Sequence, residues 1–190
     1  MRKGDFFMKR QNVRIKGFGS VQTMTMSAML TAISVVIGIF CKTFFNFGGG
    51  LFRITFENLP IIMSGIMFGP IVGGLVGAAT DIISYLLSPQ IYAINLLVTL
   101  GATSVGVVSG FFARYVFKNV GYPRLIFPSI FAHVVGSMII KPIGLYQFYG
   151  VAVLWRIPLY FVIAPLEILV LCLMYKHSSV KKLVDGGMLK

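Results

Sequence analysis

The chain has 190 residues, of which 57% are hydrophobic and 12% are charged, and its formal net charge at pH 7 is +12. Together with a mean hydropathy of +0.88, this composition excludes a water-soluble globular domain and predicts an integral membrane protein. The positive charge lies in short segments beside apolar runs, which argues against nucleic-acid binding and is typical of membrane orientation signals. At about 20 residues for each helical span, the length allows roughly six spans.

A basic leader at residues 1–20 precedes the first apolar run, at 21–41. This run is too long for the apolar core of a cleaved signal peptide, so we expect it to remain as the first helix. It contains the segment AMLTA, in which Ala28 and Ala32 lie one helical turn apart. Small residues at this spacing let helices approach closely, so this face is a candidate contact surface for another membrane protein.

Five further apolar runs complete a predicted all-α bundle of six transmembrane helices. They cover residues 54–69, 70–88, 93–117, 124–147 and 151–176. Six Lys and Arg residues lie in the leader, three near the loop after the fourth helix and four at the C-terminal end, against four elsewhere. The positive-inside bias therefore predicts that both termini are cytoplasmic. The predicted organisation is a leader at 1–20, a six-helix domain at 21–176 and a basic tail at 177–190.

The segment LFRITFENLP, where the second apolar run begins, contains two charged residues, Arg53 and Glu57. If the second helix begins by Arg53, then Arg53 and Glu57 lie four residues apart on one face and can pair as a structural latch near the outer rim. Alternatively, Arg53 contacts an anionic solute at the mouth of a pocket. Glu57 would then hold Arg53 in place or accept a hydrogen bond from the ring of the ligand. We favour the latch, and the ligand role remains open.

The third run repeats glycine every four residues, which predicts close packing inside the bundle. The last three runs carry polar residues at helical spacing. These are Asn95, Thr99 and Thr103, then Ser129, His133, Ser137 and Lys141, then Arg156, Tyr160 and Glu167. Because an unpaired polar group facing lipid is costly, these stripes predict a polar interior.

Interhelical hydrogen bonds account adequately for the Ser and Thr residues, and His133 on its own is more typical of a satisfied core histidine. Lys141 and Arg156, with Tyr146 and Trp155 nearby, instead suit an anionic ligand that carries an aromatic ring. The sequence has no phosphate-binding loop, no zinc-protease motif and too few carboxylates for a two-metal site. We therefore expect no metal, no cofactor and no ATP hydrolysis by this chain, so uptake would need a partner.

Several segments resemble the substrate-binding S components of energy-coupling factor (ECF) vitamin transporters. They lie at 28–32, 57–87, 94–110, 133–150 and 154–167, and the central block with the I-I-K and W-R-I-P segments is most similar to the folate-type branch. The resemblance implies a prokaryotic plasma-membrane protein whose outward-opening pocket is lined by the last three helices. It also implies a transmembrane coupling subunit, EcfT, docked at Ala28 and Ala32, and two ATPases, EcfA and EcfA′, that use the ATP.

The expected function is high-affinity vitamin binding, with folate as the expected vitamin and riboflavin or thiamine as alternatives. A pterin ring can stack on aromatic side chains and form hydrogen bonds with amide groups, while the two anions of a glutamate tail can pair with Lys or Arg. The predicted substrate-binding residues are Arg53, Glu57, Asn95, Thr99, His133, Lys141, Tyr146, Trp155 and Arg156. A more remote alternative is a membrane-embedded lipid-modifying enzyme that uses Glu57, Asp81, His133 and Glu167, although these residues are scattered over four helices.

Overall fold

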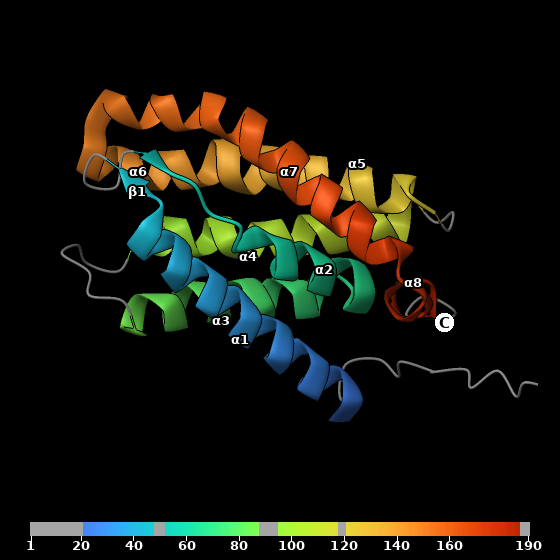
Figure 1. Ribbon diagram of the computed structural model, residues 1–190. Coiled ribbons are helices and arrows are strands. Elements are labelled where there is room, and N and C mark those ends of the chain that lie inside the picture. The colour runs from blue at the N-terminus through green and yellow to red at the C-terminus, as the bar shows by residue number, and fades with distance from the viewer. Residues whose placement is uncertain (1–20, 48–51, 88–94, 118–120, 187–190) are drawn as a thin grey trace, which may run out of the picture.

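The computed structural model describes residues 21–47, 52–87, 95–117 and 121–186, and this part of the chain forms a helical bundle (Figure 1). The elements in chain order are α1 (Val21–Phe44), β1 (Asn46–Phe47), β2 (Phe52–Arg53), α2 (Asn58–Phe68), α3 (Pro70–Leu87), α4 (Leu96–Phe111), η1 (Phe112–Val116), α5 (Pro123–Ala132), η2 (His133–Ile140), α6 (Lys141–Tyr149), η3 (Gly150–Trp155), α7 (Arg156–Lys176) and α8 (Ser178–Gly186). The predicted all-helical membrane fold is thus confirmed, with one two-stranded hairpin before α2.

Six helical passes make up the bundle. Three of them are α1, α3 and the continuous stretch formed by α4 and η1, each long and apolar enough to cross a membrane. The helical stretch Pro123–Lys176 supplies two more passes, because it reverses direction near Gly150 (Figure 1). The sixth pass is the short apolar helix α2, which lies inside the bundle with Ile61 and Ile62 fully buried. A helix that is apolar on all sides belongs in such a core position.

The predicted start of the second helix, at residue 54, is wrong. Residues 54–56 have no regular structure, and α2 begins only at Asn58. Pro60 explains this boundary, because a proline lacks the N–H of a helix interior and its ring clashes with the carbonyl four residues before it. The end of α2 agrees with the predicted boundary between residues 69 and 70: Gly69 has a positive φ of 95°, and Pro70 begins α3.

The glycine repeat of the third run packs α3 directly against α4. A Cβ on Gly73 or Gly77 would collide with the backbone carbonyl of Gly106 or Ala102 on α4. Only glycine lets the two backbones come this close, so the predicted internal packing role of the repeat is confirmed.

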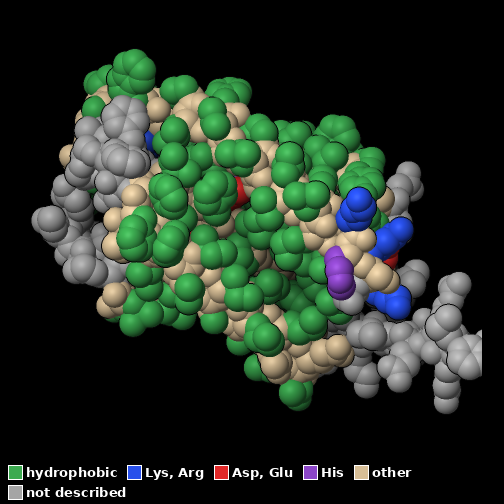
Figure 2. Space-filling view, viewed as in Figure 1, with side chains coloured by type: hydrophobic (Ala, Val, Ile, Leu, Met, Phe, Trp, Pro, Cys, Tyr) green, Lys and Arg blue, Asp and Glu red, His purple; other side chains and the backbone are tan. Residues whose placement is uncertain are grey.

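Charge and apolar surface are separated along the bundle. Hydrophobic side chains cover most of the face in Figure 2, while Lys, Arg and His side chains gather at the end where α8 lies. Exposed Lys176, Lys181 and Lys182 belong to this end, and α1 also begins there (Figure 1). Both ends of the described chain therefore lie on one side of the bundle, as an even number of passes requires. The assignment of that side to the cytoplasm stays a prediction.

Candidate functional site

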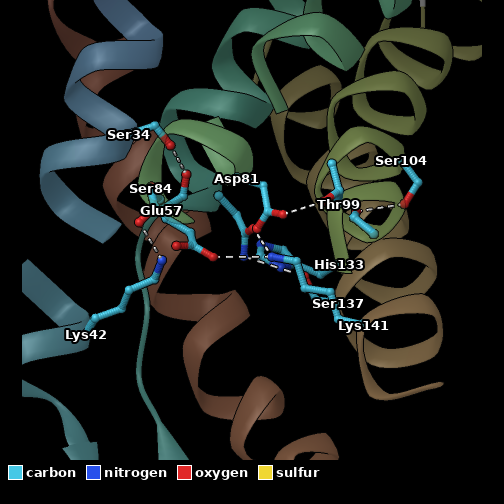
Figure 3. Close-up of polar contacts among 12 residues, drawn as sticks. Ser34, Lys42, Glu57, Asp81, Ser84, Thr99, Ser104, His133, Ser137 and Lys141 are labelled. Atoms are coloured by element: carbon cyan, nitrogen blue, oxygen red, sulfur yellow. Dashed lines mark hydrogen bonds and ion pairs between the residues drawn. The ribbon is translucent and has the colours of Figure 1, made fainter. Parts of the chain in front are cut away.

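Lys141, the first residue of α6, is buried and contacts the start of α2. Its Nζ donates to Asn58 Oδ1 at 3.0 Å and lies 3.5 Å from Glu57 Oε1. Asn58 Nδ2 in turn donates to Ser137 Oγ at 3.5 Å. Figure 3 shows Glu57, Ser137 and Lys141 converging inside the bundle. A buried ammonium group beside an amide and a carboxylate can bind a ligand that has both anionic and hydrogen-bonding groups.

The proposed latch between Arg53 and Glu57 rested on a helical spacing that the structure does not have. Arg53 lies in β2, and Glu57 immediately precedes the first residue of α2. The side chain of Arg53 falls outside the described part of the structure, so its role as latch or ligand stays a prediction. Glu57 forms an ion pair with Lys141, which is 84 residues away in the sequence.

Helix α1 also contributes to this cluster, which the sequence did not indicate. Ser34 Oγ donates to the backbone carbonyl oxygen of Glu57 at 2.5 Å, and Ser34 is fully buried. Gly38, one turn further along α1, packs against the same residue, because a Cβ there would lie 2.8 Å from Glu57 Oε2. The site residues that sequence reasoning missed are therefore Ser34, Gly38 and Asn58, since each is an ordinary residue for a packed membrane helix.

His133 belongs to a second buried pair. Its Nε2 lies 2.8 Å from Glu167 Oε2, and the two side chains are 1% and 0% exposed. The pair joins the π-helical segment η2 to α7, and the ring of Tyr160 lies 6.4 Å from the His133 ring. Removing one member of such a pair would leave an uncompensated buried polar group. The structure thus places His133 in the core, one helical turn before Ser137 and two turns before Lys141 in the chain.

Two polar side chains at the start of α4, those of Asn95 and Thr99, bond to neighbouring helices. Asn95 caps α4, because its side chain accepts from the backbone N–H of Leu97 at 2.9 Å and also donates to the carbonyl of Gly144. Thr99 Oγ1 donates to Asp81 Oδ2 on α3 at 2.7 Å. These contacts hold the helices that surround the cluster around Lys141.

Thr99→Val is expected to lower the free energy of unfolding by about 0.6–1.7 kcal/mol, the usual range for a hydrogen bond between membrane helices. The exposed Thr43 bonds only to the backbone of its own helix, so Thr43→Val serves as the matched control. Unfolding in detergent, followed by circular dichroism, measures both. Equal values for the two variants would contradict a stabilising role for the bond to Asp81.

The remaining predicted residues lie near the turn between α6 and α7. Tyr146 is 54% exposed and Trp155 is 66% exposed, while Arg156, at the start of α7, is half-buried. No described contact joins Tyr146 or Trp155 to Lys141. Of the predicted residues, Glu57 and Lys141 therefore share a buried polar cluster, whereas Tyr146 and Trp155 are exposed and lie apart from it. Among the described residues, no group of three or more His, Cys, Asp and Glu side chains is placed to hold a metal ion.

A groove lies between α1 and α3. Its volume is about 410 Å³, and it is lined by Thr23, Met24, Ser27, Ala28, Thr31, Val72, Leu75, Val76 and Ala79. Ala32 is exposed on the same helix, one turn beyond Ala28. The small side chains leave room for a helix of another membrane protein to approach α1.

Comparison with known proteins identifies both a family and a shared fold. The family described as ECF transporter, substrate-specific component, matches residues 22–175. A crystal structure of FolT bound with folic acid has a TM-score of 0.64 at 24% identity, covering 80% of this chain and 90% of that one. A structure of the S component of a bacterial ECF transporter has a TM-score of 0.58 at 22% identity, covering 82% of this chain and 94% of that one.

Two sequence relatives match shorter segments. An uncharacterized protein of Mycoplasma pneumoniae, the MG098 homolog, is 32% identical over 114 residues, which are 55% of this chain and 23% of that protein. The folate transporter FolT of Clostridium novyi is 34% identical over 59 residues, which are 31% of this chain and 34% of that protein. The matches thus span about a quarter to a third of the length of these relatives.

Proposed function

This chain belongs to the family of substrate-specific components of ECF transporters, and from this premise we propose that it is the folate-binding subunit of such a transporter. Membership makes it a substrate-binding membrane subunit and not an enzyme, so the hypothesis of a lipid-modifying enzyme is set aside. The family members bind a vitamin and associate with the coupling subunit EcfT and the ATPases. The identity of the vitamin is the part that we propose.

The observation that carries the proposal is the buried cluster of Glu57, Asn58 and Lys141. Its carboxylate and amide offer hydrogen-bonding partners for a pterin ring, while its ammonium group can pair with a carboxylate of the glutamate tail. The likeness to a structure of FolT bound with folic acid and the match to a folate transporter support folate over other vitamins. We place the exposed Tyr146 and Trp155 at the entrance, where their rings can stack on the ligand.

We further propose that the end with α8 faces the cytoplasm of a prokaryotic cell and that the vitamin enters from the opposite end. The exposed lysines near α8 agree with the positive-inside rule. The coupling subunit then docks in the groove between α1 and α3, around Ala28 and Ala32. ATP hydrolysis by the partner ATPases drives uptake, and this chain itself binds no ATP.

The test is to purify the protein in detergent, release what co-purifies and identify it by mass spectrometry. The purified protein is then titrated with folate, riboflavin and thiamine. We expect folate to bind with a Kd below about 1 µM, a standard free energy near −8 kcal/mol, without chemical turnover. Tighter binding of riboflavin or thiamine would overturn folate as the substrate. No binding of any vitamin, with or without the coupling subunit, would overturn the function.

A further inference from the structure

The bundle contains a buried histidine and glutamate pair that the proposed function does not use. His133 Nε2 lies 2.8 Å from Glu167 Oε2, and the two side chains are 1% and 0% exposed. His133 is in η2 and Glu167 is on α7, so both lie in the helical stretch that crosses the membrane twice. Titratable residues inside a membrane are costly, and they commonly mark a proton or ion site. The pair is therefore a candidate functional site.

Each side chain of the pair keeps a polar atom that the contact between them does not use. Among the described residues, His133 Nδ1 and Glu167 Oε1 have no hydrogen-bond partner. When the imidazole is neutral and its Nε2–H faces the carboxylate, Nδ1 keeps a lone pair that can accept a proton. Protonation at Nδ1 turns the neutral ring into an imidazolium beside the carboxylate, so the net charge of the pair changes from one negative charge to zero.

The charged groups near the pair belong to the cluster around Lys141. Glu167 interacts electrostatically with His133, Lys141 and Glu57. The ring of Tyr160, also on α7, lies 6.4 Å from the His133 ring and is a further titratable side chain beside the pair. Helix α4 packs against η2 and helix α2 packs against α7, and neither helix contains a titratable residue. Figure 3 shows His133, Lys141 and Glu57 in the same part of the interior. A charge that arrives at Lys141 therefore acts on the pair.

We propose that the pair of His133 and Glu167 is a proton-binding site that takes up a proton from the medium when the vitamin binds. The inference rests on the proposed function, because it requires a carboxylate of the vitamin at Lys141. The 8 residues of η2 separate His133 from Lys141, a length that corresponds to about 12 Å of helix. At an effective dielectric constant of about 20, a unit negative charge at this distance favours protonation of the pair roughly tenfold.

Proton uptake makes the vitamin bind more tightly as the pH falls. The bound state holds more protons than the free state, so lowering the pH through the range in which the pair titrates favours the bound state. Histidine ordinarily titrates between about pH 5 and 8, whereas lysine and carboxyl groups ordinarily titrate outside this range. A pH dependence of binding within this range therefore reports on the pair and not on the charges of Lys141 or of the vitamin.

The experiment titrates the full-length protein in detergent with folate by isothermal calorimetry between about pH 5.5 and 8. At each pH, two buffers of different ionisation enthalpy give the number of protons taken up for each folate bound. For the wild type we expect a Kd roughly five- to tenfold lower at the acidic end and a peak uptake of about half a proton, the value that tenfold coupling gives at its midpoint.

The double variant His133→Gln with Glu167→Gln replaces the pair with two amides that can hydrogen-bond to each other. It is expected to take up no proton, and its Kd is expected to stay within about twofold across the same pH range. His177→Gln is the matched control, because His177 is the second of the two histidines of the chain and is exposed near the end with α8. It is expected to keep the wild-type pH profile.

Three outcomes would overturn the proton site. Folate binding by the wild type without proton uptake would reject it and leave the proposed function intact, and this measurement does not depend on the folding of any variant. Unchanged uptake in the double variant, or loss of uptake in His177→Gln, would place the proton on another group. Absence of folate binding by the wild type would reject both the proton site and the proposed function.

Discussion

Lys141→Met is expected to abolish folate binding and to lower the free energy of unfolding by about 3–5 kcal/mol, the usual cost of breaking a buried ion pair. Lys141 and Glu57 are both buried, so removal of the ammonium group breaks a buried ion pair and removes one positive charge from beside the carboxylate of Glu57. Methionine keeps the length and apolar stem of lysine, which limits the loss of packing. Folate titration and thermal unfolding in detergent measure the two effects separately.

The double variant Glu57→Gln with Lys141→Met separates binding from stability. It removes both charges, so most of the lost stability is expected to return, since a neutral pair avoids the penalty of one unpaired charge. Folate binding is expected to remain absent, because the cation that pairs with the glutamate tail is still missing. Recovery of binding in the double variant would mean that Lys141 only neutralises Glu57 and does not contact the vitamin.

The helical fold could be predicted because the bilayer leaves few alternatives. Every backbone polar group in the hydrocarbon must be satisfied within its own segment, so long apolar runs must be helices. Composition alone does not locate the ends of the helices. For this reason the predicted second helix begins at residue 54, four residues before the observed start of α2 at Asn58. Pro60 itself was the available signal, since it limits how far α2 can reach toward the N-terminus.

The candidate site could be predicted only in part. Helical spacing correctly groups Ser137 with Lys141, because residues four apart share a face. The partners Glu57 and Asn58 lie more than 80 residues away, and only the side-chain contacts between the start of α2 and the start of α6 reveal them. Arg124 is a comparable case: it is one of the three basic residues near the loop after the fourth predicted helix, yet it is 0% exposed. Its electrostatic partner Asp185 is on α8, a helix in the tail that the sequence did not indicate.

Ala28→Trp is expected to prevent association with the coupling subunit while leaving folate binding by the isolated protein within twofold of wild type. An indole ring at Ala28 would fill part of the groove of about 410 Å³ and keep a partner helix away from α1. Overpacking of a close contact costs up to about 3 kcal/mol, which corresponds to more than a 100-fold weaker Kd. Ala32→Trp, one turn further along the exposed face, is expected to act in the same way.

Ile33→Trp is the matched control, because Ile33 is 48% exposed on α1 but does not line the groove. It adds an indole to the same helix on a lipid-facing side, so complex formation is expected to persist. Size-exclusion chromatography of the protein with the coupling subunit and ATPases separates bound from free protein, and folate titration confirms that each variant is folded. If Ala28→Trp forms the complex as well as Ile33→Trp does, the coupling subunit docks elsewhere. If Ala28→Trp instead loses folate binding and still forms the complex, then this face of α1 supports the pocket, and the small residues serve internal packing.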